Sequence, residues 1–364
     1  MKKVNLFKSS LYAVALGAVA AFGISCTKTN VNEPAAASQS DDQAAAGTRG
    51  GLFASAADTA AAVNNLYFFQ SVSGQLQQTM QYATNAKDGN GVFYNYQTDE
   101  FYQVSRKNKT IYVFAGASTM GGTPAPSRTI VDTTLSSGRE IAYDTKRDIL
   151  YVANNSDSSI RVYRKFSTLS GSIKGDIVKI QGQPWGISYD RSNNRLIVAM
   201  DLTAMRLDIF DRPNDFVPGA AIASRSLNIA DRPNGAFSRL HGVTYNSDDD
   251  ILIVTEIGEA AAPIVPTPDK PAFNADGGIY IFKNAAAKLA AGGTMSADGL
   301  IYGDATGLGN PVDVDTRNIH GETFIYIAEK ANKKIITFKV NPGNTIPVTA
   351  LTTTYSPEAI SLWR

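Results

Sequence analysis

The feature that most constrains this chain is a repeated pattern of three short strands separated by polar turns. The clearest copy, residues 138–163, reads GREIAYDTKRDILYVANNSDSSIRVY, and a second, PWGISYDRSNNRLIVAMDLTAMRLDIF, ends at Phe210. Three further copies keep this order and end at Phe114, Phe282 and Phe338. Self-similarity of this kind predicts a repeat architecture in which each copy is one supersecondary unit.

An aromatic residue closes the third strand of every copy. The string NLYFF supplies an earlier example, so the series is Phe69, Phe114, Tyr163, Phe210, Phe282 and Phe338. The first three separations between successive members of this series match the roughly 40 to 50 residues of a four-stranded propeller blade, and the later separations are longer. A fourth strand fits within each gap, for example DIVKI at 176–180. Each unit therefore predicts a small antiparallel sheet.

The two ends of the chain complement each other. Residues 356–363, SPEAISLW, resemble a first strand that has no successor, whereas residues 51–82 resemble second, third and fourth strands that have no first. Pairing them would close a ring and protect open sheet edges. We therefore predict an all-β, six-bladed β-propeller over residues 51–364, closed by N- and C-terminal strands. The alternative is a five-bladed ring with unrelated edge strands.

The repeats carry a family resemblance. LYVANNSDSSIRVY resembles the YVTN and NHL types of propeller repeat, and GISYDRSNNRLIV and IYIAEKANKKIITF are similar to it. The resemblance covers most of residues 90–338. It implies binding and scaffolding, as in most members, although similar six-bladed rings also include lactonases and other hydrolases.

The N-terminus predicts export. A basic start precedes an apolar stretch at 11–24, which is too short to span a bilayer and is typical of a signal peptide over residues 1–25. Phe-Gly-Ile-Ser-Cys resembles a bacterial lipobox, with Gly23 replacing the usual leucine. We expect Cys26, the single cysteine, to be acylated and to anchor the protein in the outer membrane or at the cell surface. Cleavage nearby that leaves a free thiol is the alternative.

Residues 26–50 have too few large apolar side chains to form a core, and they predict a flexible tether. The whole chain has 34 basic and 33 acidic residues, so nucleic acid is not an expected partner. We expect a monomer that contacts the membrane through its lipid anchor alone.

A ligand site is predicted at the channel mouth, where the innermost strand of each blade begins. Alignment of the copies places these residues there: Asn90, Arg139, Trp185, His241, Asn310 and Glu358. This mixed ring predicts a site for a small molecule, a glycan or a protein. The alternative is that the residues are ordinary polar groups at a water-filled mouth, with Arg139 paired to Glu358.

Carboxylates end the second strands on the same face. Glu256 joins the predicted ligand site, beside Asn154, Asp201 and Glu329. Converging carboxylates could hold calcium, as in metal-dependent lactonases, and the alternative function is therefore a hydrolase with a metal near Glu256, Asp201 and Glu358. The competing interpretation is that these residues bond to their own turns.

No catalytic motif, resident metal or cofactor is predicted. His241 could act as a general base near Glu256, whereas His320 lies in a turn on the opposite face. The sequence has no G-x-S-x-G elbow and no phosphate-binding glycine loop. A proline-containing insertion at 257–278 is expected to overhang the ligand face, and residues 284–293 to form one short helix.

Overall fold

The computed structural model describes residues 50–58, 64–202, 204–235, 238–258, 272–340 and 345–363. The predicted signal peptide, Cys26 and the tether lie outside these residues, as does most of the insertion at 257–278. In the part of the chain that is described, no helix is long and apolar enough to cross a membrane.

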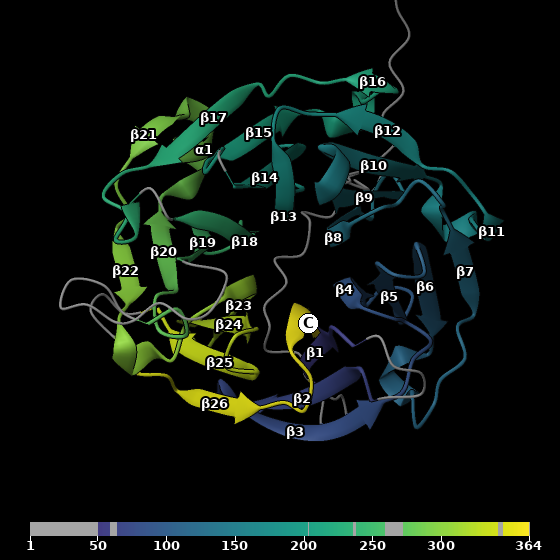
Figure 1. The fold of residues 1–364 in the computed structure, drawn as a ribbon, viewed down its shortest axis with the longest axis horizontal. Coiled ribbons are helices and arrows are strands. Elements are labelled where there is room, and N and C mark those ends of the chain that lie inside the picture. The colour runs from purple at the N-terminus through teal and green to yellow at the C-terminus, as the bar shows by residue number, and fades with distance from the viewer. Residues whose placement is uncertain are drawn as a thin grey trace, which may run out of the picture. The chain divides into compact units, whose positions relative to one another are not determined.

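Six antiparallel sheets form the blades of a propeller, as the sequence predicts (Figure 1). Blade 1 contains, from the channel outward, β27 (Pro357–Trp363), β1 (Gly51–Ala56), β2 (Leu66–Val72) and β3 (Gln75–Tyr82). Blade 2 contains β4 (Gly89–Asn95), β5 (Glu100–Ser105), β6 (Thr110–Ala115) and β7 (Arg128–Val131). Blade 3 contains β8 (Gly138–Asp144), β9 (Ile149–Asn154), β10 (Ser159–Arg164) and β12 (Asp176–Lys179).

The other three blades repeat this order. Blade 4 contains β13 (Gln183–Asp190), β14 (Arg195–Asp201), β15 (Leu207–Asp211) and β17 (Arg225–Ile229). Blade 5 contains β18 (Arg239–Asn246), β19 (Ile251–Ile257), β20 (Gly278–Lys283) and β22 (Gly299–Tyr302). Blade 6 contains β23 (Pro311–Ile319), β24 (Glu322–Glu329), β25 (Lys334–Lys339) and β26 (Thr349–Thr352). Each innermost strand contacts the next one around the ring.

Short additional elements lie at the rim. β11 (Gly171–Ser172), β16 (Gly219–Ala220) and β21 (Gly293–Met295) each pair in parallel with the outermost strand of the preceding blade. Because each comes from the connection between the third and fourth strands of its own blade, it links neighbouring blades at their outer edges. The helix expected near residue 284 is α1 (Ala285–Ala291).

Strands from both ends of the chain close the ring. β27 pairs antiparallel with β1, so that Leu362 lies opposite Leu52 and Ile360 opposite Ala54. This pairing places β27 in the first-strand position that β1, β2 and β3 lack. The predicted six-bladed closure is confirmed, and the five-bladed alternative is wrong.

Side chains also hold β27 to the blades on either side. In blade 6, the carboxylate of Asp313 accepts a hydrogen bond from the backbone N–H of Ile360 at 2.7 Å. Toward blade 2, the hydroxyl of Ser361 accepts one from the backbone N–H of Tyr94 at 3.0 Å. The first bond gives a partner to a backbone N–H of β27, and the second gives one to a backbone N–H of β4.

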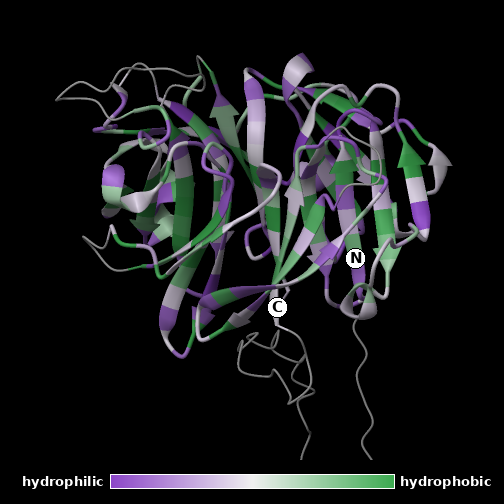
Figure 2. Ribbon diagram, turned by 60° about the horizontal axis from the view of Figure 1, so that its bottom comes forward, coloured by the Kyte–Doolittle hydropathy of each residue, from purple (hydrophilic) through white to green (hydrophobic). Residues whose placement is uncertain are grey.

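The core lies between the blades. One apolar cluster joins β5, β6 and β7 of blade 2 to β8, β9 and β10 of blade 3, and other clusters fill the spaces between other neighbouring blades. Both faces of a central strand are consequently covered, and all six residues of β9 are buried. Figure 2 shows hydrophobic residues running along the strands inside the blades. Near-continuous apolar strands such as ILYVAN follow from this double coverage.

A tyrosine and an aspartate brace the turn between the first two strands of several blades. In blade 3 the Tyr143 hydroxyl donates to Asp148 at 2.6 Å, and the Ser167 N–H donates to the same carboxylate at 2.9 Å. Asp148 has a φ of 55°, a conformation that Asp and Asn tolerate better than most residues. Blade 5 repeats the bond between Tyr245 and Asp250. These braces lie on the face opposite the channel mouth.

Truncating a side chain of the closing strand should destabilise the whole ring. Trp363 is 9 % exposed and packs against Phe53 and Tyr94. Trp363→Ala should lower the free energy of unfolding by about 3 to 5 kcal/mol, measured by chemical denaturation. Ile222→Ala, which truncates a side chain that is 80 % exposed, is the control and should leave stability unchanged. Equal stability of the two variants would contradict the role given to β27.

A candidate ligand site at the channel mouth

A β-bulge shapes the start of the innermost strand in blades 2 to 5. The strand register shifts between Gly89 and Val92, Gly138 and Ile141, Pro184 and Ile187, and Leu240 and Val243. A bulge re-aims the side chains of the extra residue and its neighbour. The bulges contain Asn90, Arg139, Trp185 and His241, which the sequence placed at equivalent positions.

The register of blade 6 corrects one member of the predicted ring. Pro311 lies opposite Glu329, as Gly138 lies opposite Asn154 in blade 3, so Val312 is the residue equivalent to Arg139. Asn310 precedes the strand. The shared proline was the available signal, because Pro184–Trp185 in blade 4 corresponds to Pro311–Val312 in blade 6.

Three planar side chains stack across blades 3, 4 and 5. The guanidinium of Arg139 lies 3.9 Å from the ring centroid of Trp185. On Trp185 the imidazole of His241 is stacked with 3.7 Å between centroids and an interplanar angle of 3°. The solvent-exposed fraction of each residue falls along the stack: Arg139 is half-buried, Trp185 is 8 % exposed and His241 is 2 % exposed. Arg139 therefore forms the outer end of the stack.

A carboxylate from the end of β14 lies beside the inner end of the stack. Asp201 Oδ1 is 3.4 Å from His241 Nε2, and Arg239 donates to both Asp201 oxygens at 2.8 and 2.7 Å. Burial raises the pKa of Asp201, but hydrogen bonds from His241 and Arg239 outweigh it and hold that pKa well below its ordinary value. Burial lowers the pKa of His241 to about 4, although Asp201 opposes the shift. At neutral pH the pair is a carboxylate and an uncharged imidazole.

Polar atoms without a hydrogen-bond partner gather at this mouth. In the described part of the chain, Arg139 Nε, both ring nitrogens of His241, Asn310 Oδ1 and Glu358 Oε2 are buried and lack one, although His241 Nε2 has Asp201 Oδ1 at 3.4 Å. The other Glu358 oxygen accepts from Lys330, and an Arg139 terminal nitrogen lies 3.5 Å from Asn90 Oδ1. Buried polar groups are seldom left unpaired in native proteins, so this concentration requires an explanation.

The structure does not bring Glu256 to His241. One Glu256 oxygen accepts from Asn234 at 2.7 Å and the other accepts from the hydroxyl of Tyr280, all within or beside blade 5. The geometry does not support His241 as a base beside Glu256, because the carboxylate facing His241 is that of Asp201.

The remaining carboxylate at the end of a second strand, Glu329, binds backbone groups. Glu329 accepts hydrogen bonds from the N–H groups of Gly309, Asn310, Ala331 and Asn332. Over the described ranges, no group of three or more His, Cys, Asp or Glu residues is arranged to hold a metal ion. The turn-bonding interpretation of Glu329 is the one that the geometry supports.

Two buried carboxyl groups that the sequence analysis missed lie in the same layer of the channel. Glu140 follows Arg139 in the bulge of blade 3, and Asp313 holds the equivalent position in blade 6, on the opposite side of the ring. Burial, together with the charge of the other carboxyl group, raises the pKa of Glu140 well above its ordinary value, and burial also raises that of Asp313. The pair therefore retains a shared proton. The sequence did contain a sign of this pair, because the equivalent residue in each of the other four blades is Gly or Ala.

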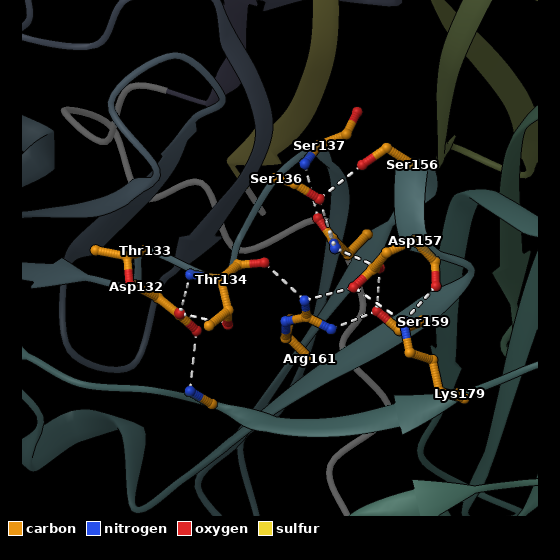
Figure 3. A network of polar contacts seen from close by, with 12 residues as sticks. Asp132, Thr133, Thr134, Ser136, Ser137, Ser156, Asp157, Ser159, Arg161 and Lys179 are labelled. Atoms are coloured by element: carbon orange, nitrogen blue, oxygen red, sulfur yellow. Dashed lines mark hydrogen bonds and ion pairs between the residues drawn. The ribbon is translucent and has the colours of Figure 1, made fainter.

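A polar network supports the rim of the mouth in blade 3 (Figure 3). The side chain of Arg161 is 1 % exposed and donates to Asp157 Oδ2 and to the carbonyl of Thr134, each at 2.7 Å. Lys179 donates to the Asp157 carbonyl at 2.6 Å. These bonds join the connection that enters β8 to the loop between β9 and β10.

The same loop reaches the stack. Asn155, next to the network, donates from Nδ2 to the carbonyl of Pro184 at 3.2 Å, and Pro184 directly precedes Trp185. The network thereby fixes the backbone that carries the central ring of the stack.

Comparison with known proteins shows a shared fold. No protein-family model and no curated protein matches this sequence. A solved nidogen/laminin complex is similar with a TM-score of 0.56 and 12% identity, over 86% of this chain and 97% of the other. A Lactobacillus plantarum protein has a TM-score of 0.55 and 11% identity, over 86% of this chain and 100% of the other.

A third solved structure is that of a Bacteroides fragilis protein described as a candidate 6-phosphogluconolactonase. Its TM-score is 0.55 at 12% identity, over 89% of this chain and 100% of the other. At such identities these likenesses show the propeller fold alone. The resemblance to YVTN and NHL repeats stays a prediction.

The carboxyl pair should make stability depend on pH. A carboxyl group whose pKa is raised in the folded state stabilises the fold below its unfolded pKa, and that contribution is lost as the pH rises through the folded pKa. Glu140→Gln removes one titrating group, so between pH 5 and pH 8 its free energy of unfolding should fall less than that of the wild type. Chemical denaturation at both pH values measures this. Glu322→Gln, which changes an exposed side chain, is the control, and its free energy of unfolding should depend on pH as in the wild type. The same pH dependence in Glu140→Gln as in the wild type would contradict the shared proton.

Proposed function

We propose that this chain is a non-catalytic propeller, anchored in a bacterial envelope through Cys26, that binds a small polar molecule at the mouth of its channel. One observation supports this most directly: buried, partnerless polar atoms of Arg139, His241, Asn310 and Glu358 gather there. A bound molecule would supply the missing hydrogen-bond partners. Because these atoms are buried, a small molecule fits the site better than a glycan chain or a protein surface.

The stack of Arg139, Trp185 and His241 suits binding. An indole held between two planar groups is rigid, so little side-chain entropy is lost when a ligand packs beside it. Movement of Arg139 would free one apolar face of the indole, which together with the neighbouring polar atoms would provide contact area and orientation, the combination typical of small-molecule sites.

The state of His241 favours binding over catalysis. With a pKa of about 4, the imidazole is a much weaker base at neutral pH than an ordinary histidine. It stacks on Trp185, and the hydrogen bonds found among the described residues give it no hydroxyl or thiol partner that it could activate.

The alternative function is a metal-dependent hydrolase using Glu256, Asp201 and Glu358. Such a site would need these carboxylates to converge on one cation. Instead, both Asp201 oxygens accept from Arg239, both Glu256 oxygens accept from side chains of its own region, and one Glu358 oxygen accepts from Lys330. These bonds favour the binding function.

A ligand screen tests the proposed site. Thermal-shift measurements on the purified protein against amino acids, sugars, organic acids and phosphates should give stabilising compounds whose effect is lost in Trp185→Ala, because this change removes the centre of the stack. His320→Ala, on the opposite face, is the control and should keep the effect. Compounds that stabilise Trp185→Ala as well as the wild type would contradict this site. Chelator-sensitive lactone hydrolysis that is lost in Glu256→Gln would favour the hydrolase.

The proposed anchor has a separate test. Cys26→Ser removes the only thiol that can be acylated, so the variant expressed in a bacterial host should leave the membrane fraction and become soluble. Fractionation followed by immunoblotting measures this. Ser25→Ala, which keeps a small residue before the cysteine, should remain with the membrane. Detergent-dependent membrane association of Cys26→Ser would overturn the proposal.

A further inference from the structure

We infer that the ligand is a hydroxylated monoanion, of which an acidic sugar is the simplest kind, with its anionic group at Arg139 and hydroxyl groups at His241 and Glu358. This inference rests on the proposed binding site and goes further by naming the ligand's chemistry. Two features of the channel mouth lead to this inference: its charged groups, and the polar atoms there that have no hydrogen-bond partner.

The charges at the mouth leave one cation without a carboxylate partner. The charged groups that act on Arg139 most strongly are Arg106, Glu358, Asp88 and Asp201. The Arg106 guanidinium lies 2.9 Å from Asp88, and the two remaining carboxylates have basic partners of their own.

Arg139 itself forms no ion pair within the described ranges, and burial lowers its pKa to about 10. A guanidinium at this pKa is still charged at neutral pH. The one side chain with which it forms a hydrogen bond in the described residues is Asn90, and Oδ1 at 3.5 Å is a weak partner. A negative charge on a ligand would give the guanidinium the ion-pair partner that it lacks.

Apart from Arg139 Nε and His241 Nε2, which lies 3.4 Å from Asp201, the partnerless atoms need donors. Asp201 faces His241 Nε2 and, as a carboxylate, it accepts only, so Nε2 carries the imidazole proton and Nδ1 presents a lone pair. Glu358 Oε2 and Asn310 Oδ1 are acceptors as well. A ligand therefore needs one anionic acceptor group and several neutral donors, which hydroxyl groups supply.

An ammonium group fits less well than a hydroxyl group. Lys330 already neutralises Glu358, so a second cation there would lie close to the lysine ammonium. An ammonium group would also make the ligand a zwitterion, which has no net charge to balance that of Arg139. The charge count therefore favours a hydroxy acid over an amino acid.

Entry requires movement of the Arg139 side chain, since it covers the more buried members of the stack. Arg139 is held by the long bond to Asn90 and by its contact with Trp185. A charge-assisted hydrogen bond between an anion and the guanidinium is stronger than such a cation–π contact, so displacement by the anion is favourable.

Calorimetry with three probes on the purified full chain separates charge from hydroxyl groups. D-Gluconate carries both, D-glucose carries hydroxyl groups without charge, and hexanoate carries charge without hydroxyl groups. D-Gluconate should bind saturably, and each of the other two at least tenfold more weakly. Equal affinity for D-gluconate and hexanoate, or for D-gluconate and D-glucose, would overturn the inference.

Variants assign the anion to Arg139. Arg139→Gln should abolish the preference for D-gluconate over D-glucose, and Arg139→Lys, which keeps the charge, should retain part of it. Arg191→Gln makes the same chemical change in an exposed turn on the opposite face and should bind like the wild type. Melting temperatures of all variants establish that they are folded. Retained preference in Arg139→Gln would contradict the assignment.

The probes also separate this inference from the proposed function. If D-glucose, or an amino acid from the screen, binds in a Trp185-dependent manner while D-gluconate does not, the site stands and the monoanion is wrong. If D-gluconate binds equally well to wild type and Trp185→Ala, the site itself is wrong.

Discussion

The pairing of β27 with β1 is the interaction on which the rest of this structure depends. It joins the two ends of the propeller in one sheet and leaves no innermost position vacant. It also brings Glu358 from the end of the chain to the ring that contains Asn90 and Arg139, because β27 contacts β4 and β4 contacts β8. The candidate site therefore exists only when the ring is closed.

Closure also forces the innermost strands close together. A Cβ atom on Gly91 would lie 2.7 Å from the carbonyl oxygen of Arg139, and one on Gly242 would lie 2.8 Å from the Cα of Asp313. Real Cβ atoms do not approach backbone this closely, so these positions require glycine. Glu140 and Asp313 are the large residues in this layer, and both are buried. A ligand is consequently expected at the mouth, above the carboxyl pair.

The sequence was informative where structure is local or repeated. Strand order, the closing pair and the positions of Arg139, Trp185 and His241 all follow from aligning the repeats, since equivalent residues occupy equivalent places in each blade. Side-chain partners were less predictable. His241 meets Asp201 of the preceding blade rather than Glu256 of its own, and Glu140 meets Asp313 across the ring. Such contacts depend on how the blades are arranged around the central axis. Alignment of the repeat sequences with one another does not describe that arrangement.

The charge states of the stack explain why its geometry is suited to recognition. A protonated His241 would place a second cation one ring away from Arg139, in a site where burial already lowers the pKa of both groups. The uncharged imidazole avoids that repulsion, and hydrogen bonds from His241 and Arg239 stabilise Asp201 as an anion. Arg139 is then the charged member of the stack, and it lies at the outer end, where an incoming molecule meets it first. Trp185 and the lone pair of His241 lie behind it, so electrostatic attraction precedes contact with the buried acceptors.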